Sequence, residues 1–163
     1  MPKENPIRPT DEDARTLARA LIREARFGAL AVRDPETGHP YVSRIAIGQT
    51  PRGAPLSFVS ELAHHTRALR ADPACALLLG EPGPTGDPLT HPRLSLMATA
   101  RFVPRDAPEH AALAAHYLAT HPKARLYIGF ADFHFVRFDI QGAHLNGGFG
   151  KAYQLQPSDL PGM

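Results

Sequence analysis

The stretch FGALAVRDPETGHPYVSRIAIGQTPRGAPLSFV, from Phe27 to Val59, decides the fold class of this chain. Three short apolar runs lie within it, at residues 27–32, 41–48 and 55–59. The segments between them carry Asp, Pro, Thr and Gly, which is the composition of tight turns. Short strands joined by tight turns predict an antiparallel β-barrel or meander.

The flanking sequence adds helices and more strands. Thr10 or Asp11 caps a helix with acidic residues in its first turn, and apolar residues at helical spacing continue it to about Arg26. Two more helices are expected, at about 65–70 and 108–121. Further strands are expected at 74–79, 93–103 and 133–140. In the last of these, the set His134, Val136, Phe138 and Ile140 is expected to point inward. The fold class is therefore mainly β with flanking helices.

The length of 163 residues predicts one domain with one core. Residues 1–9 hold three prolines and are expected to be a flexible N-terminal arm. The domain is expected over residues 10–153. Residues 154–163 are expected to be a disordered tail.

Composition excludes several classes of function. A formal charge of +2, with scattered basic residues, argues against nucleic-acid binding. No apolar run approaches the roughly 20 residues that span a bilayer, and the N-terminus does not resemble a signal peptide, so we expect no membrane partner and a cytoplasmic protein. The single Cys75 excludes an intrachain disulfide. We expect no metal site, since there is one cysteine and the helical histidines His110, His116 and His121 are not spaced to share one face.

Polar side chains gather where the third strand ends and the short helix begins. Hydroxyls, imidazoles and guanidinium groups there meet the unpaired N–H groups of a helix start, which suits an anion such as a phosphate monoester. The candidate cofactor-binding residues of this segment and the preceding strand are Ser43, Arg44, Ser60, His64, His65, Thr66 and Arg67. The alternative is structural: Ser60 or Thr66 caps the helix and Arg67 is solvated.

Two other segments are candidates for ligand contact. Arg93 begins a strand directly after a Gly/Pro-rich loop, and it either points into a cleft or is solvated at the strand end. Gly147-Gly148-Phe149-Gly150-Lys151 allows close approach of the backbone to a flat ligand, with Phe149 free to pack on it. The alternative is a plain glycine-rich connection. No nucleophile–base pair is present, so the catalytic residues remain unassigned.

Seven segments, in this order, resemble the flavin-binding split-barrel proteins related to pyridoxamine 5′-phosphate oxidase, and most of all their haem-utilisation branch. The segments are FGALA (27–31), PYVSR (40–44), LAHHTRAL (62–69) with Asp72-Pro73, GDPL (86–89), HPRLSL (91–96), FADF (130–133) and HLNGGFGKA (144–152).

The resemblance implies a six-stranded antiparallel split β-barrel that forms a homodimer, with FMN in a cleft between the subunits. It places Ser43 and Arg44 on the strand that lines the flavin, residues 64–67 on the phosphate-binding segment, and Arg93 near the isoalloxazine ring. Phe149 or Tyr41 would shield a ring face. The basic pair that the family has at the phosphate is replaced here by two histidines.

The function expected from this resemblance is that of an FMN-binding oxidoreductase of unknown small-molecule substrate. Two alternatives stay open. One is a haem-binding or haem-degrading protein, in which His144 either serves as a ligand or is an ordinary histidine of the barrel. The other is a flavin carrier or sensor without turnover. Oxidation of pyridoxamine phosphate is not expected, because the residues that bind pyridoxal phosphate in true oxidases cannot be placed.

Overall fold

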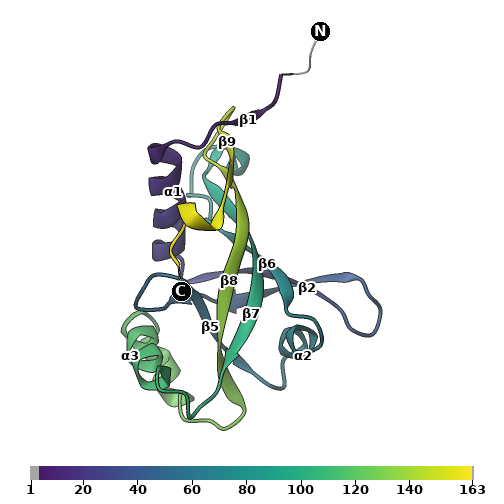
Figure 1. Ribbon diagram of the computed structural model, residues 1–163, viewed down its shortest axis with the longest axis vertical. Coiled ribbons are helices and arrows are strands. Elements are labelled where there is room, and N and C mark those ends of the chain that lie inside the picture. The colour runs from purple at the N-terminus through teal and green to yellow at the C-terminus, as the bar shows by residue number, and fades with distance from the viewer. Residues whose placement is uncertain (1–3, 163) are drawn as a thin grey trace.

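The computed structural model describes residues 4–162, and nine strands form one sheet (Figure 1). The strands are β1 (Ile7–Arg8), β2 (Phe27–Arg33), β3 (Pro40–Ala46), β4 (Gly48–Gln49), β5 (Pro55–Ser60), β6 (Ala74–Leu79), β7 (Arg93–Val103), β8 (Phe133–Asn146) and β9 (Ala152–Leu155). The α-helices are α1 (Glu12–Glu24), α2 (His64–Ala71) and α3 (His110–Thr120). Short 3-10 turns cover Pro88–Thr90, Pro122–Leu126 and Pro157–Asp159.

The strand pairings close the sheet on itself. The order runs β3-β2-β6-β7-β8, and β5 pairs with the first part of β8. Strand β4 pairs with β5 and follows β3 after the single residue Ile47, so it links the two ends of the series. All these pairs are antiparallel. The predicted mainly β split barrel with flanking helices is confirmed. The strand total of nine exceeds the expected six because β1, β4 and β9 are short additions.

Two apolar clusters occupy the two sides of the barrel wall. The larger fills the interior with alternate residues of the strands, including Leu30, Leu77, Leu96 and Phe138, each fully buried. The smaller lies outside the wall, between β5, β8 and α3, and contains Phe58, Phe135, Leu113 and Tyr117. The expected inward set of β8 is partly right: Val136 and Phe138 are buried inside, but Phe135 is also buried, because α3 covers the outer face there.

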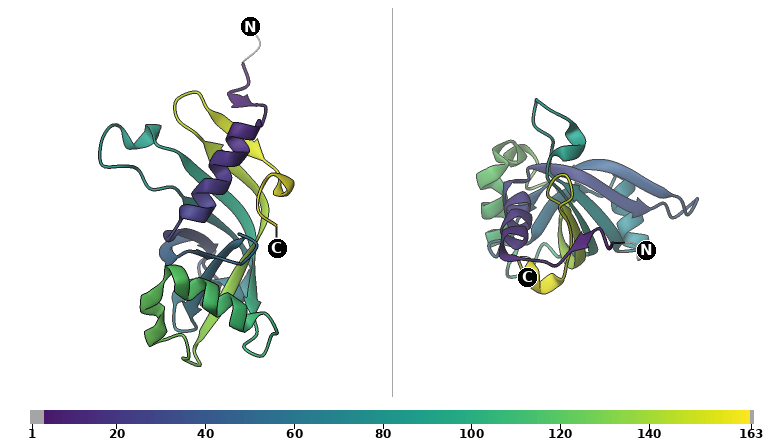
Figure 2. Two further views of the ribbon diagram at one scale, coloured as in Figure 1. Left: turned by 90° about the vertical axis from the view of Figure 1, so that its left-hand side faces the viewer. Right: turned by 90° about the horizontal axis from the view of Figure 1, so that it is seen from above.

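Each helix covers a different part of the barrel. Helix α1 contributes Ala14, Ala18 and Ile22 to the interior cluster, and its N-cap Asp11 accepts a hydrogen bond from the Ala14 N–H at 2.8 Å. Helix α2 contributes Ala68 and Leu69 to the same cluster. In Figure 2 α1 lies above α3 on one side of the molecule, whereas Figure 1 shows α2 on the other side. Part of the outer wall is therefore covered by helices and part is not.

The C-terminal segment differs from the expected disordered tail. Strand β8 continues to Asn146 instead of ending at Ile140, and the glycine-rich segment turns the chain back into β9. Leu155 at the end of β9 and Leu160 beyond it are buried, and Asp159 accepts a hydrogen bond from Arg15 Nε at 2.7 Å. The prolines at 157 and 161 suggested disorder, but two buried leucines and one ion pair to α1 hold the segment on the barrel.

The expected N-terminal arm is described only from residue 4. Residues 4–9 are exposed, as an arm would be, but Ile7 and Arg8 pair in parallel with Ala152 and Tyr153 of β9. Residues 1–3 lie outside the described part. Among residues 4–162, no helix is both long and apolar enough to cross a membrane.

Candidate functional site

The predicted anion site lies at the start of α2, where β3 and β5 meet it. Ser43 Oγ is 3.2 Å from His65 Nδ1, so the strand and the helix start are joined by a hydrogen bond. A shallow hollow of about 230 Å³ lies beside this pair and is lined in part by Arg44, Ser60 and His65. The structure therefore brings β3, β5 and α2 together as the sequence predicted.

His64 is engaged on both ring nitrogens. Arg67 Nη2 donates to His64 Nδ1 at 3.3 Å, and His64 Nε2 faces Asp34 Oδ1 at 3.6 Å. The ring of Tyr41 contacts the His64 ring edge-on, with centroids 4.8 Å apart. Residue 34 lies in the β2–β3 turn, so this turn and the helix start hold His64 between them.

Ser60 is used inside the chain, whereas Thr66 is buried without a hydrogen-bond partner in the described chain. Ser60 Oγ donates to Asp132 Oδ2 at 3.3 Å and accepts from the Leu62 N–H at 3.1 Å. Thr66 is fully buried, and its hydroxyl has no hydrogen-bond partner among the described residues. Its side chain therefore lies beneath the surface of the helix start instead of on it.

The electrostatics weaken the site as a phosphate cradle. Burial lowers the pKa of His65, and the neighbouring His64 lowers it further, so His65 is neutral at pH 7. The pKa of Asp34 is lowered, chiefly by the Glu36 N–H, and this keeps a carboxylate beside His64. What remains for an anion is Arg67, Arg44 and the N–H groups of a helix start that no side chain caps. A flavin phosphate fits these residues only in part.

The other predicted site residues lie at the opposite end of the barrel wall. Arg93 begins β7 opposite Asn146, and its Nη1 donates to the Leu89 carbonyl at 2.9 Å. Phe149 and Lys151 lie in the β8–β9 connection, and Phe149 is 96% exposed. In the sheet order β6 and β2 stand between β7 and β3, so a single chain does not bring Arg93 to Ser43.

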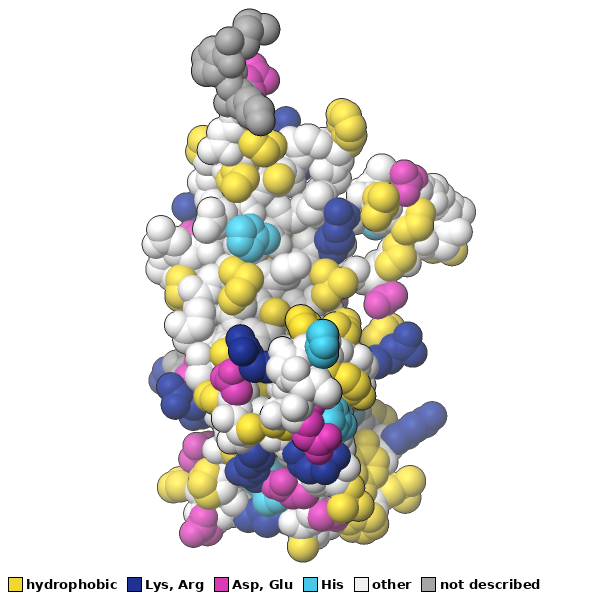
Figure 3. Space-filling view, turned by 90° about the vertical axis from the view of Figure 1, so that its right-hand side faces the viewer, with side chains coloured by type: hydrophobic (Ala, Val, Ile, Leu, Met, Phe, Trp, Pro, Cys, Tyr) yellow, Lys and Arg dark blue, Asp and Glu magenta, His cyan; other side chains and the backbone are white. Residues whose placement is uncertain are grey.

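Between these two ends the outer wall carries no helix. We call this region the bare face: the outward apolar side chains of β3, β2, β6 and β7, namely Ala29, Ala31, Val42, Ala76, Leu78 and Met97. Arg44 of β3, opposite Ala29, lies on the same face. Val42 is 62% and Leu78 46% exposed. On this side of the molecule, Figure 3 shows mostly white and yellow surface with a few dark blue side chains over the upper part, and most of the charged side chains lower down. An exposed apolar surface of small side chains is typical of a face that another molecule covers.

His144 lies at the edge of the bare face. It is on β8 opposite Ser95, which is in turn opposite Leu78 of β6, so all three point outward in one row. Strands are about 4.8 Å apart, so His144 lies about 10 Å from Leu78. Arg93 is two residues from Ser95 on the same face of β7, and it therefore lies near His144.

The histidines differ in how their ring nitrogens are used. The chain has nine. His64, His91 and His121 use both nitrogens within the chain. Others have one nitrogen engaged or buried, namely His65, His134 and His110. Within residues 4–162, the rings of His39, His116 and His144 make no hydrogen bond, ion pair or aromatic contact. Of these three, His144 alone belongs to the row that crosses the bare face.

From the sequence, His144 is predicted only as an alternative ligand, and the bare face is not predicted at all. The signal for the bare face is present in FGALAVR, where small residues alternate with the large interior residues Leu30 and Val32. The solvated face of an antiparallel sheet ordinarily carries polar side chains, so alanines at the outward positions of a strand indicate a face that is not built for water alone.

Comparisons with known proteins agree on one family. The pyridoxamine 5′-phosphate oxidase family matches residues 15–147. The non-canonical heme oxygenase HOZ, chloroplastic, of Arabidopsis thaliana is 32% identical over 116 residues, which is 71% of this chain. A heme-binding protein from Mycobacterium smegmatis superposes with a TM-score of 0.83 over 96% of this chain, at 28% identity. The protein Atu2129 of Agrobacterium tumefaciens, of unknown function, superposes with a TM-score of 0.78 over 94% of this chain, at 34% identity.

These relatives are longer than this chain. The match covers 34% of the Arabidopsis protein, and 63% of both the mycobacterial and the Agrobacterium chains.

Proposed function

Since this chain belongs to the pyridoxamine 5′-phosphate oxidase family, we propose that it is a haem-binding protein that holds haem on the bare face. The observation that carries this proposal is His144: an exposed imidazole, without a partner in the described chain, in the row that crosses the apolar surface. Neutral imidazole is a common axial ligand of haem iron. The printed names of two relatives, a heme oxygenase and a heme-binding protein, support the choice.

The residues of the bare face suit a flat apolar ring system. Ala29, Ala31 and Ala76 project little from the sheet, so a planar molecule can lie against them, with Val42 and Leu78 in contact with its surface. His144 would ligate the iron, and Arg93 would pair with a propionate carboxylate. When bound, haem would supply the redox chemistry with oxygen, and the chain would supply ligation, orientation and exclusion of water.

We also propose that two copies of the chain associate through the bare face, with the cofactor between them. Val42 and Leu78 are exposed in the single chain, so an interface that buries them would be stabilised by the hydrophobic effect. Such an assembly would also explain why the predicted site residues fall into two groups on one chain. The α2 group of one copy could then meet Arg93, Phe149 and Lys151 of the second copy.

FMN is the second candidate, since the start of α2 retains the groups noted above. Arg67 and Arg44 would hold the phosphate with the help of the helix N–H groups, and the flavin would carry electrons in an oxidoreductase or a carrier. The internal pairing of His64, His65 and Ser60 makes this candidate weaker than haem.

The test is to titrate the purified protein with hemin and, separately, with FMN, following absorbance. We expect a sharpened, shifted Soret band with hemin that survives gel filtration. We expect His144→Ala to change the position of the Soret band. The matched control is His116→Ala, which removes an exposed histidine of α3 and should leave the spectrum unchanged. Retained flavin bands with no Soret shift would favour FMN over haem as the cofactor. Equal hemin spectra for the unmodified protein, His144→Ala and His116→Ala would reject His144 as the ligand.

A further inference from the structure

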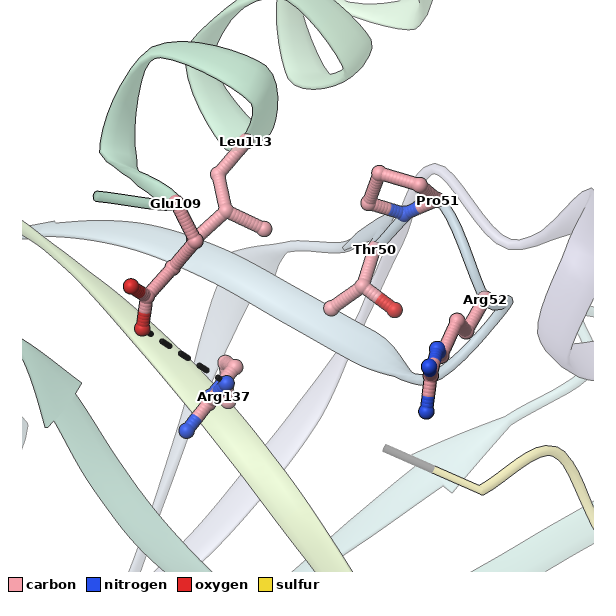
Figure 4. Close-up of a pocket in the computed structure, with 6 residues that line it drawn as sticks. All are labelled: Thr50, Pro51, Arg52, Glu109, Leu113 and Arg137. Atoms are coloured by element: carbon pink, nitrogen blue, oxygen red, sulfur yellow. Dashed lines mark ion pairs between the residues drawn. The ribbon is translucent and has the colours of Figure 1, made fainter. Parts of the chain in front are cut away.

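A separate pocket lies under α3, at the other end of β8 from His144. Its volume is about 320 Å³, within the range of small-molecule sites. Figure 4 shows three walls: Thr50, Pro51 and Arg52 from the β4–β5 turn, Glu109 and Leu113 from the start of α3, and Arg137 from β8. Neither the predicted cofactor residues nor the bare face contributes to it.

Arg137 is incompletely paired in this pocket. Its Nε is buried and has no hydrogen-bond partner among residues 4–162. Its Nη1 faces Glu109 Oε1 at 3.8 Å, which is beyond hydrogen-bond distance. A guanidinium with an unused N–H donor is a ready partner for a carboxylate, which accepts two parallel hydrogen bonds from such a group.

A second arginine on the neighbouring strand makes an anion beside Arg137 more favourable. Arg101 of β7 lies directly opposite it, and like charges in that position repel each other. Arg101 has its own partner, because its Nε donates to Asp139 Oδ2 at 2.9 Å. Among the described residues, the one ion-pair partner of Arg137 is the more distant Glu109, whose side chain is itself 43% exposed.

One unpaired polar atom belongs to the lining of this pocket. In the described chain, four buried side-chain atoms lack a hydrogen-bond partner: Thr66 Oγ1, His110 Nε2, Arg137 Nε and Asp139 Oδ1. Of these four residues, only Arg137 lines the pocket. Buried polar groups without partners are rare in native proteins, so the unused N–H of Arg137 points to a polar ligand.

We infer that this pocket binds a small carboxylate with an apolar body. The carboxylate would accept from Arg137, with Arg52 adding positive charge on the opposite wall, and the apolar body would lie on Leu113 and Pro51. Thr50 Oγ1 already accepts from the Ala54 N–H at 3.1 Å, and its hydroxyl hydrogen remains able to donate to the ligand. The inference does not depend on haem or FMN.

The test uses 4-phenylbutyrate as the probe and 4-phenylbutan-1-ol as its uncharged analogue, with binding measured by calorimetry on the full chain. We expect the carboxylate to bind at least about tenfold more tightly than the alcohol, the size of effect of a charge-assisted hydrogen bond. Arg137→Met should remove this difference. Arg101→Met is the comparison variant: it removes a neighbouring positive charge that does not line the pocket, so it should weaken the probe less than Arg137→Met does.

A second variant moves affinity in the opposite direction. Glu109→Gln removes the carboxylate that competes for Arg137, so the probe should bind more tightly, and the amide should be tolerated because the Glu109 side chain makes no capping hydrogen bond. The inference is wrong if the probe and the alcohol bind equally. It is also wrong if Arg101→Met weakens the probe as much as Arg137→Met, or if Glu109→Gln weakens it. A change of oligomeric state in Arg137→Met would instead identify the pocket as a contact between copies of the chain.

Discussion

The outer wall of this barrel has two apolar halves, of which one is covered by a helix and the other is not. Over β5 and the first part of β8, α3 covers the wall, and the residues beneath it are large and aromatic, such as Phe58 and Phe135. Over β3, β2 and β6 no helix covers the wall, and the outward residues are mostly small. Both halves are apolar, so both need cover, but the chain itself supplies it for one half only.

The side chains of the two halves differ in size, and this difference indicates which kind of partner each half contacts. Aromatic rings interlock with a helix of irregular surface: Phe58 and Phe135 have centroids 4.6 Å apart and both contact Tyr117 of α3. Alanines leave a nearly flat sheet, which suits a planar cofactor or a second copy of the same sheet. The covered half therefore stabilises the monomer, and the bare half is available for function.

The largest expected effect comes from the covered half. Phe135→Ala should lower the free energy of unfolding by about 3–5 kcal/mol, because it leaves a cavity between Phe58 and Tyr117. Val42→Ala on the bare face should lower it by less than about 0.5 kcal/mol in dilute solution, where chains are apart. Urea denaturation of both variants measures the difference, and equal losses would remove the distinction between the halves.

A charge on the bare face should act on assembly and not on folding. Val42→Glu should weaken self-association by at least about tenfold, because an unpaired charge would be buried between two copies. Leu126→Glu is the matched control, as Leu126 is 80% exposed and lies in the Pro122–Leu126 turn, outside the strands of the bare face. Sedimentation equilibrium measures both. If the two variants associate alike, the copies do not meet through this face.

A smaller effect is expected at the start of α2. The pKa of His65 is lower in the folded chain than in the unfolded one, so the unfolded chain binds the proton more readily. Stability from this group is therefore complete above about pH 6.5 and falls as the pH drops through the lowered folded value. His65→Gln should give a flatter dependence of the urea midpoint on pH between 7.5 and 5. Parallel curves for the two proteins would show that His65 titrates alike in both states.

Much of the fold could be predicted from local sequence. The turn at Asp34–Gly38 and the alternation in β2 and β7 place strands within one or two residues of their observed bounds. The continuation of β8 to Asn146 was missed, because Gly142 interrupts its apolar pattern, and the reason lies on the neighbouring strands: the last four residues of β8 pair with β7 on one side and with β9 on the other. Such a contact between strands distant in sequence has no local signal.

The candidate site was predictable in its members but not in their pairing. The sequence showed that Ser43, His64, His65 and Arg67 meet at α2, but it could not show that Asp34 and Asp132 already engage two groups of this site. Both acids come from turns whose position depends on the closed barrel. The α3 pocket was missed for the same reason, since Arg52, Glu109 and Arg137 are joined only by the tertiary fold.

The most direct test of the central claim compares the two candidate surfaces in one experiment. Hemin affinity would be measured for Leu78→Glu, on the bare face, and for Arg67→Gln, at the start of α2, beside the unmodified protein. The account predicts that Leu78→Glu weakens hemin binding by at least about tenfold through burial of an unpaired charge, and that Arg67→Gln leaves it nearly unchanged. Loss of hemin binding in Arg67→Gln with normal binding in Leu78→Glu would contradict the account and return the cofactor to the α2 site.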